Sequence, residues 1–515
     1  MRKVELKDGI DSVQIRSLIQ NNMSDTVRIV MVGFGNIGQA VVPLLHAHFP
    51  GCHVIALDQN RDAIRRARAA SMGVELIQCR VDALNFSQAI APHLRAEDFL
   101  LNLAPAVSSC ALLALAQSCG AFYLDTGIEP WAYALSNESA DATSNHALRE
   151  AMLTVQRARP GTQTALVAHG ANPGFVSLLV KRALLELARV LEPSRADDHR
   201  VPRTRQQWAA LAQALDVRVI QISESDTQRA DTPRAADEFV NTWSVEGFAT
   251  ECLQPVEIGW GTHERVLPAG ARRWRDGSQA AIQLAQRGHE IAVQTWTPLR
   301  GPLTACILTH NESISIAEYF TAPVEDGRAG EVWRPTVYYA YRPCADAVGS
   351  MALLGEMNEM GEMDKMDKMD KMGETGGNWR ERVMKDEIVA GEDELGVLVM
   401  SGRGQSVWFG SALSIARARE LAPYNNATSL QVASSIVAGM QWMREHPREG
   451  IVESDAIDDE AAFERARPYW EPMQCATTAW RPEPASPALT FDEFLLPGRT
   501  LATPDSPDPA LAHAA

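Results

Sequence analysis

Three glycines near the start of the chain have the spacing of a dinucleotide-binding turn. Gly33, Gly35 and Gly38 lie in GFGNIG, directly after the apolar run 27–32 and before a helical stretch. In such a turn the first glycine permits the tight bend and the second lets a pyrophosphate approach the backbone. The third allows the helix to pack closely, and the helix N-terminus attracts the phosphates.

An acid completes this fingerprint. Asp58 ends a second apolar run, 20 residues after Gly38, where a carboxylate binds ribose hydroxyls and disfavours a 2′-phosphate. The pattern therefore predicts NAD rather than NADP, although Arg61 nearby weakens that preference. The residues expected to contact NAD are Gly33, Gly35, Asn36, Ile37, Gly38, Asp58, Asn102 and Thr126.

A second stretch combines carboxylates with tryptophan. Between residues 222 and 264 only Arg229 and Arg234 oppose the acids, and Trp243 and Trp260 lie in the same stretch. Carboxylates beside an indole can bind alkylammonium groups, and the cation–π attraction is worth roughly 0.5–2 kcal/mol. A solvated acidic face with tryptophan in the core is the alternative interpretation. The acids are Glu224, Asp226, Asp231, Asp237, Glu238, Glu246, Glu251, Glu257 and Glu264.

Three shorter clusters could also carry chemistry. Glu129 lies in LDTGIEPW, just after a predicted strand, where ligands bind in open α/β sheets. Asn172 lies in the turn-rich segment HGANPG, and His310 lies two residues before Glu312, a pairing suited to proton transfer. No His, Cys or Asp grouping has metal-ligand spacing, so we expect no metal.

The elements that must position these residues follow from hydrophobic periodicity. Apolar runs of strand length alternate with helical stretches of about ten residues, which is typical of a parallel sheet with crossover helices. We therefore expect an α/β, Rossmann-type domain at the N-terminal end. The expected strands are 27–32, 53–58, 74–79, 99–103 and 122–125, and the expected helices are 39–48, 61–71, 84–95 and 109–118.

The rhythm changes after residue 174. Helices are expected at 175–191 and 206–215, and strands and loops alternate from 217 to 340, which indicates an α+β domain. Asp-Lys-Met repeats at 364–372 predict a surface insertion. The predicted organisation is an extension 1–22, a Rossmann NAD-binding domain 23–171 completed by helices around 425–480, an α+β substrate and dimerisation domain 172–424 with a low-complexity insertion 355–377, and an irregular tail 482–515.

Composition limits the function classes. The chain has 515 residues and a net charge of −17, which disfavours nucleic-acid binding. Its eight cysteines are scattered without a CxxC pair, which points to a reducing compartment. The N-terminus lacks the apolar region of a secretory signal, and runs such as 111–116 are too short to span a bilayer. We expect a cytoplasmic protein without a membrane segment.

Taken together, the motifs resemble bacterial homospermidine synthases. The matching segments run in order from about 27 to 475 and include MVGFGNIGQAVVPLL, LDTGIEPW, HGANPGFVS, ISESDTQRA, FVNTWSVEGF, LTHNESISIAE, DELGVLV and NNATSLQVASSIVAGM. More distantly, the layout is similar to that of the saccharopine dehydrogenase superfamily. The resemblance implies a Rossmann domain with an inserted α+β domain, and a homodimer.

The resemblance also implies an activity. The family joins two putrescines into homospermidine and releases ammonia, while bound NAD⁺ takes a hydride and later returns it. Putrescine is the expected substrate, with spermidine as a second amine that could replace it.

The family motifs assign roles to particular residues. Trp243 is expected to hold cationic intermediates by cation–π contact, and Glu251 to bind an ammonium end. Glu129 and Glu224 are expected to bind or deprotonate amines, with Asn172 near the nicotinamide and His310 as a proton carrier. The catalytic residues are thus Trp243, Glu129, Asn172, Glu224, Glu251 and His310, and the substrate-binding residues are Glu129, Glu224, Trp243, Glu251 and Glu312.

One position departs from the family. The family usually reads Asn-Leu-Ser-x-Asp after the fourth strand, whereas this chain reads NLAPA over 102–106. The aspartate position falls on Ala106, so one expected amine-binding acid is absent there. A different acid would have to hold the outer ammonium.

Two other functions compete. A net NAD(P)-dependent reductase of the saccharopine or carboxyspermidine dehydrogenase type would need Arg or Lys to bind substrate carboxylates, whereas the pocket motifs contain acids and tryptophan. A non-catalytic NAD- or polyamine-binding protein is the third reading, motivated by Ala106.

Overall fold

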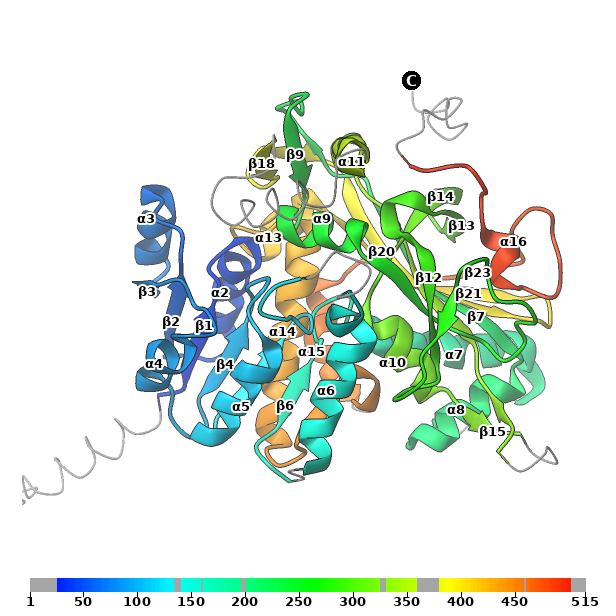
Figure 1. Cartoon of the computed structure of the whole chain (residues 1–515), viewed down its shortest axis with the longest axis horizontal. Coiled ribbons are helices and arrows are strands. Elements are labelled where there is room, and N and C mark those ends of the chain that lie inside the picture. Colours follow the sequence, from blue (N-terminus) through cyan, green and yellow to red (C-terminus); the bar gives the residue numbers. More distant parts are fainter. Residues whose placement is uncertain are drawn as a thin grey trace, which may run out of the picture.

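The computed structural model describes residues 26–133, 140–158, 161–195, 201–324, 330–358, 379–457 and 460–501. Two large sheets with helices around them make up most of these ranges (Figure 1). The predicted extension 1–22, residues 359–377 of the predicted insertion and residues 502–515 of the predicted tail lie outside the described residues. None of the described helices is both long and apolar enough to cross a membrane.

The N-terminal sheet is parallel, as the alternation of strands and helices predicts. Its order is β22-β6-β5-β4-β1-β2-β3, so β1 lies where the strand order reverses. Helices cover both faces, and alternate residues of β1 therefore pack into two different apolar clusters. The strands are β1 (Arg28–Val32), β2 (His53–Asp58), β3 (Glu75–Gln78), β4 (Phe99–Asn102), β5 (Phe122–Asp125), β6 (Ala165–Val167) and β22 (Ile451–Glu453).

The helices beside this sheet follow the predicted crossover pattern. One apolar cluster contains α2 and α14, and the other contains α5. The predicted stretch 84–95 is divided into the short helix α4 and a 3₁₀ turn at Ala91–His93. The helices are α2 (Asn36–His48), α3 (Ala63–Ser71), α4 (Phe86–Ile90), α5 (Ser109–Cys119), α6 (Asn145–Ala158) and α14 (Ala427–Glu445).

The second sheet has ten strands and is mixed. Strand β7 lies at its centre, parallel to β17 on one side and antiparallel to β20 on the other. The strands are β7 (Val217–Asp226), β10 (Pro255–Gly259), β11 (Arg272–Arg273), β12 (Ala281–Arg287), β13 (Ala292–Thr297), β14 (Gly301–Leu308), β17 (Thr336–Arg342), β20 (Glu392–Ser401), β21 (Ser406–Ser414) and β23 (Met473–Thr478). Helices of this part include α7 (Val176–Leu191), α8 (Arg205–Ala214), α9 (Val245–Leu253), α10 (Asn311–Tyr319) and α11 (Ala345–Asn358).

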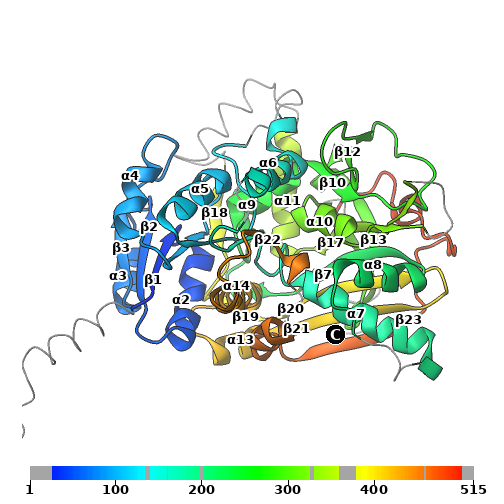
Figure 2. The ribbon, with the colours of Figure 1, turned by 90° about the horizontal axis from the view of Figure 1, so that it is seen from below.

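The C-terminal part of the chain returns to the first sheet. Helix α14 packs against α2 and lies between the two sheets (Figure 2), and β22 pairs with β6 at the sheet edge. The chain then crosses back, because β23 pairs with β21 of the second sheet. The two sheets are therefore joined by covalent connections and by a shared apolar core.

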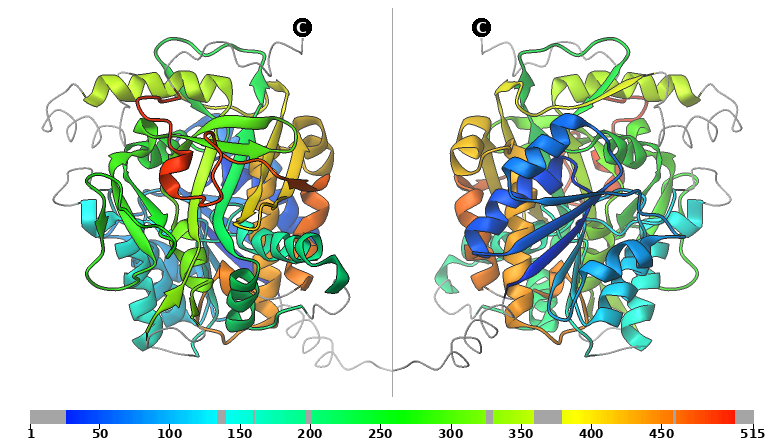
Figure 3. Two further views of the ribbon diagram at one scale, coloured as in Figure 1. Left: turned by 90° about the vertical axis from the view of Figure 1, so that its right-hand side faces the viewer. Right: turned by 90° about the vertical axis from the view of Figure 1, so that its left-hand side faces the viewer.

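The C-terminal segment is more ordered than the predicted irregular tail. It contains the short helix α16 (Phe491–Phe494) and lies across the second sheet (Figure 3, left). Phe491 and Phe494 are fully buried against Tyr338, and the Phe491 N–H donates to Glu264. The two side chains are three residues apart, so they lie on one face of the helical turn and anchor this Pro-rich segment on the sheet.

Candidate active site

The glycine-rich turn between β1 and α2 has the geometry that the fingerprint requires. Gly33 has a φ of +95°, and a Cβ there would lie 2.8 Å from the Leu103 carbonyl oxygen. A Cβ on Gly38 would lie 2.5 Å from the Gly33 carbonyl oxygen. A Cβ on Gly35 would meet nothing within 4 Å. The protein thus requires two of the glycines for its own packing and leaves open space over the third.

The acid at the end of β2 is already hydrogen-bonded. Asp58 accepts from the N–H groups of Phe34 and Asn60, both at 2.7 Å, and pairs with Arg65 at 2.9 Å. The carboxylate therefore lies against the glycine-rich turn, where the fold places an adenosine ribose. With the open space at Gly35, these residues fit a dinucleotide.

Other expected cofactor residues surround the same sheet edge. Asn36 begins α2 and donates to the carbonyl oxygens of Thr242 at 3.2 Å and Trp243 at 3.3 Å. Asn102 ends β4 and donates to Val107, while its buried Oδ1 has no partner among the described residues. Ile37 lies in the first turn of α2, and Thr126 directly follows β5.

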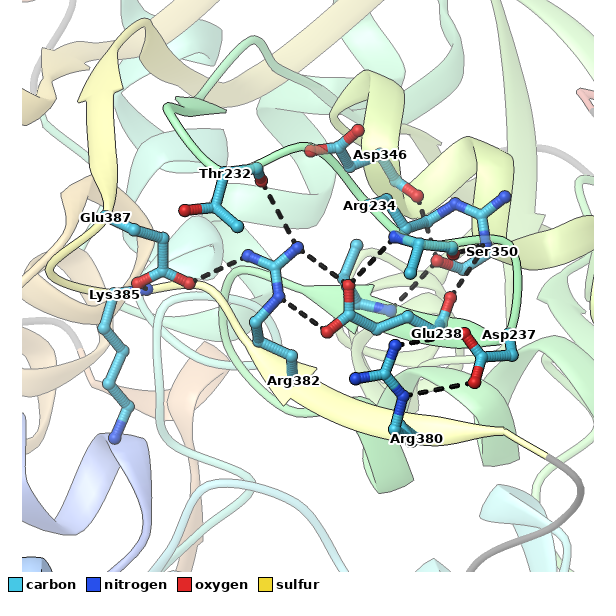
Figure 4. Close-up of polar contacts among 12 residues, drawn as sticks. Thr232, Arg234, Asp237, Glu238, Asp346, Ser350, Arg380, Arg382, Lys385 and Glu387 are labelled. Carbon is cyan, nitrogen blue, oxygen red and sulfur yellow. Dashed lines mark hydrogen bonds and ion pairs between the residues drawn. The ribbon is translucent and has the colours of Figure 1, made fainter.

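The segment 380–387 of the second part of the chain extends toward the N-terminal part (Figure 4). Strand β18 (Arg380–Val383) pairs in parallel with β9 (Glu238–Asn241), and Arg382 pairs with Glu238 and Glu387. This network holds Lys385, and Figure 4 shows its side chain directed away from the network toward the N-terminal part. Burial, together with the charges of Arg65 and Arg68, lowers the pKa of Lys385 to about 8.

A cavity lies between the carboxyl end of the parallel sheet and the second sheet. Its wall is formed by the loop after β5, by α9 and by the segment before α10. No Arg or Lys is among the described residues that line it, and those residues include three carboxylates. Its polar lining includes Glu129, Tyr133, Asn145, Glu246, Glu251 and His310.

Glu129 is held at the cavity wall by backbone groups. Its Oε2 accepts the Ala106 N–H at 3.0 Å, and its own N–H donates to the Ser109 hydroxyl at 2.9 Å. Burial raises the pKa of Glu129 to about 7, and the charges of Glu251 and Glu246 act in the same direction. The carboxyl group can therefore gain or lose a proton near neutral pH.

His310 lies between two carboxylates. Its Nε2 is 3.1 Å from Glu251 Oε2 and its Nδ1 is 3.1 Å from Glu312 Oε1, and its ring lies 4.5 Å from that of Tyr339. Burial alone lowers the pKa of His310, but the two carboxylates outweigh burial and hold that pKa well above its usual value. His310 is therefore a buried cation, and Glu312 lies behind it with its side chain only 2% exposed.

Glu224 lies near the end of β7, behind this ring. Its Oε2 accepts the Tyr339 hydroxyl at 2.6 Å and the Asn172 side-chain amide at 3.2 Å. Burial raises the pKa of Glu224 to about 7, and the charge of Asp226 acts in the same direction. The chain of contacts from Asn172 through Glu224 and Tyr339 thus ends at His310 on the cavity wall.

Trp243 is placed between the glycine-rich turn and α9. It is half-buried, its ring packs edge-on to Phe248 with centroids 6.5 Å apart, and a Cβ on Gly247 would lie 2.6 Å from it. Its carbonyl oxygen accepts from Asn36 of the turn. The described cavity wall contains Glu129, Glu251 and His310 of the expected residues, whereas Trp243, Asn172 and Glu224 lie next to it.

Some residues of this site were missed from the sequence. Tyr339 lies in the strand TVYYAYR, and its aromatic alternation predicts only a half-buried strand. Asp393 lies in the apolar strand EDELGVLVMS, and burial and the charge of Glu224 raise its pKa. A buried acid within an apolar strand is the one local signal that could have singled it out. Within the described ranges, no group of three His, Cys, Asp or Glu side chains is arranged as a metal site.

A pair of glycine substitutions tests the cofactor turn. Because Gly35 has open space and a φ of −72°, Gly35→Ala should leave the free energy of unfolding unchanged. Its methyl group would nevertheless stand where a pyrophosphate approaches, so we expect NAD⁺ affinity to fall about ten-fold, which is about 1.4 kcal/mol. Isothermal calorimetry and urea unfolding measure the two effects. Gly38→Ala should lower both the free energy of unfolding and the NAD⁺ affinity. Unchanged NAD⁺ affinity in Gly35→Ala would contradict the assignment of this turn to the pyrophosphate.

Comparisons with known families agree with this architecture. The saccharopine dehydrogenase NADP binding domain matches residues 29–167, and the saccharopine dehydrogenase C-terminal domain matches residues 170–477. These two matches cover the glycine-rich turn and the cavity.

Individual relatives are similar over nearly the whole chain. The homospermidine synthase of Blastochloris viridis is 42% identical over 468 residues, which is 90% of this chain and 93% of that protein. The homospermidine synthase of Mesorhizobium japonicum is 39% identical over 479 residues, with 91% and 93% covered. The crystal structure of the homospermidine synthase of Legionella pneumophila in complex with NAD has a TM-score of 0.77 and 35% identity, covering 92% of this chain and 98% of that one.

Proposed function

Because the chain belongs to the homospermidine synthase family, we propose that it joins two putrescines into homospermidine with release of ammonia. The observation that supports this best is the cavity wall. It brings Glu129, Glu246 and Glu251 together beside a dinucleotide turn, and no Arg or Lys is among the described residues that line it. Such a wall suits a dication better than a substrate with a carboxylate.

The glycine-rich turn, Asp58 and Asn36 would hold NAD. When bound, NAD⁺ accepts a hydride from an amine carbon and returns it to the later imine, so that no net oxidation results. Asn36 also ties the turn to the Trp243 segment, so the cofactor site and the amine site are positioned by one side chain.

Carboxyl groups of the site handle the protons. The carbon beside an ammonium group cannot release a hydride until the nitrogen has lost a proton. Glu129 and Glu224 both have a pKa of about 7, so each can take a proton at neutral pH and give it back to the departing amine. His310 is held as a cation by Glu251 and Glu312. In this protonated state it cannot act as a base, and it orients the carboxylates of Glu251 and Glu312.

The cationic intermediates need fixed negative groups. Glu251 and Glu246 lie on the cavity wall, and Trp243 offers an indole face next to it. Preorganised charges of this kind stabilise the iminium between the two hydride transfers. At Ala106, where the family has an aspartate, only the backbone N–H points to Glu129, so we propose Glu246 for the outer ammonium.

Product analysis tests the proposed function. The purified protein is incubated with putrescine and NAD⁺, without added NADH, and the amines are separated. We expect homospermidine and ammonia without accumulation of NADH. NADH rising together with an aldehyde, or turnover that needs a carboxylated amine or ketone, would instead establish a net reductase.

The indole of Trp243 gives a second test. If cation–π contact stabilises the iminium by about 2 kcal/mol, Trp243→Leu should lower kcat about 30-fold. Steady-state kinetics of homospermidine formation measures this change. Trp333→Leu is the matched control, since that half-buried indole lies on β16 (Val332–Trp333), outside the cavity wall. A kcat in Trp243→Leu equal to that of the control would contradict the cation–π role.

We also propose a homodimer, which the family resemblance implies, and a cytoplasmic location. The eight cysteines are unpaired, which is consistent with a reducing compartment. Light scattering of the purified protein tests the dimer, and a monomer at micromolar concentration would contradict it.

A further inference from the structure

Three carboxyl groups meet at the carboxyl end of β7, behind the cavity. In the antiparallel pair of β7 and β20, Asp393 is the register partner of Asp226, two residues from Glu224. Asp393 is 0% exposed, Glu224 2% and Asp226 3%. None of the three has an ion pair within the described ranges, so the cost of burying three charges has to be avoided in another way.

The hydrogen-bond donors are unequally divided among the three acids. Asp226 accepts from the Gln228 N–H at 2.8 Å, from the Gln228 amide at 3.1 Å and from the Thr242 hydroxyl at 2.8 Å. Such a carboxylate can remain ionised. Glu224 accepts from Tyr339 and Asn172 through one oxygen.

Asp393 is different. Its Oδ2 accepts the Thr428 hydroxyl, whereas its buried Oδ1 receives no donor from the described residues. In the register of β7 and β20, Asp393 and Glu224 nevertheless occupy diagonally neighbouring positions on one face of the sheet, so their carboxyl groups can meet. A hydrogen bond between two carboxyl groups requires a proton on one of them, and the oxygen without a donor is the one that can carry it.

Burial and the charges of Glu224 and Asp226 raise the pKa of Asp393 well above its usual value. Four other titratable groups face this cluster. Burial raises the pKa of the Tyr339 hydroxyl and of the Cys344 thiol, so neither supplies a charge. Tyr341 of β17 is fully buried with a raised pKa and supplies no charge, and the His310 cation acts on Glu224 and lowers its pKa. His310 is already balanced by Glu251 and Glu312, so the cluster keeps excess negative charge.

We propose that Asp393 is a positioning residue that carries a proton on Oδ1 and donates it in a hydrogen bond to Glu224, so that the pair holds one negative charge, on Glu224. Its catalytic consequence rests on the function proposed above. When Glu224 takes a proton from a substrate ammonium, the pair becomes neutral. When Glu224 returns that proton to the departing amine, the pair regains its single charge, and Asp393 keeps its own proton throughout.

Substitutions at Asp393 separate its hydrogen bond from its charge. Asp393→Asn keeps a neutral donor toward Glu224, so we expect kcat within about three-fold of the unmodified protein and an unchanged acid limb of the pH profile. Asp393→Val removes the donor, so we expect kcat to fall at least ten-fold. We also expect its acid limb to move to higher pH, because Glu224 then loses a group that favours its charged form.

An infrared difference spectrum tests the proton directly. A buried protonated carboxyl has a carbonyl band that shifts in deuterium oxide. Because Glu129, Glu224 and Glu264 also carry protons near pH 7, the spectrum of Asp393→Asn is subtracted from that of the unmodified protein, and the difference should contain one such band. Asp455→Asn is the matched control, because Asp455 is also a buried acid but lies at a 3₁₀ turn (Ser454–Ala456) away from the cavity wall. In that control background, subtracting the spectrum of the Asp393→Asn/Asp455→Asn double variant should give the same band, and the pH profile of Asp455→Asn should be that of the unmodified protein.

Two results would overturn the proposal. An acid limb that moves to lower pH in Asp393→Asn would mean that Asp393 is ionised in the unmodified protein. A difference spectrum without that band would mean that another group holds the proton. Because the spectrum needs no substrate, it decides the protonation of Asp393 even if putrescine is not converted, and product analysis alone decides the proposed function.

Discussion

Replacing Glu224 by Gln is expected to lower kcat for homospermidine formation by about 10²–10⁴-fold, the usual contribution of a general base. The amide occupies the same space and can still accept from Tyr339 and Asn172, but it cannot take a proton. Because the pKa of Glu224 is about 7, activity should fall below pH 7 in the unmodified protein. Initial rates measured from pH 5.5 to 9 test both statements.

Two further variants sharpen this experiment. Glu264→Gln changes another buried glutamate whose pKa is also about 7, but which anchors the C-terminal segment. It should leave kcat nearly unchanged. Glu129→Gln tests the other candidate base, and a much larger loss there than in Glu224→Gln would transfer the role of base to Glu129.

Replacing His310 by Leu is expected to destabilise the protein by about 3–5 kcal/mol, because one partner of a buried charge cluster is removed. Glu312 would keep a buried carboxylate without its cation, and Glu251 would lose its contact at 3.1 Å. Urea unfolding at several pH values measures the loss. The double variant His310→Leu/Glu312→Gln should regain part of the stability, because it removes the fully buried charge of Glu312 and leaves only the partly exposed Glu251 without its cation.

The pH dependence of this loss has a defined sign. The folded-state pKa of His310 is raised, so its contribution to stability is complete below the pKa of about 6.5 that histidine has in an unfolded chain. The contribution disappears as the pH rises through the folded-state value. The difference between the unmodified protein and His310→Leu should therefore be larger at pH 6 than at alkaline pH. An equal or larger difference at high pH would show that His310 is neutral when folded.

Much of the N-terminal fold was predictable from short stretches of sequence. The strand runs and the glycine spacing identified β1, β2, β4, β5 and the turn before α2 to within a residue or two. The apolar runs predict strands because a parallel strand is buried on both faces. The glycine spacing predicts the turn because backbone neighbours of Gly33 and Gly38 exclude a Cβ. The family, its cofactor and its amine chemistry also followed from ordered local motifs.

The arrangement of the second sheet could not be predicted in this way. Its central strand β7 pairs with β17 and β20, which lie more than a hundred residues away in the chain. No local pattern reports which strands pair over such distances. The same limit applies to the C-terminal segment, where Phe491 and Phe494 are apolar residues in a Pro-rich stretch whose contact with Tyr338 exists only after folding.

What the sequence determined by itself is the set of chemical groups: a dinucleotide turn, carboxylates, an indole and a histidine beside an acid. What only the tertiary structure decided is their protonation and their order around the cavity. A pKa depends on burial and on charges within a few ångströms, and these neighbours come from different elements. His310 is held as a cation by Glu251 of α9, and the pKa of Asp393 of β20 is raised by burial and by the charge of Glu224 of β7. The spacing of residues along the chain predicts neither the contact of His310 with Glu251 nor the proximity of Asp393 to Glu224.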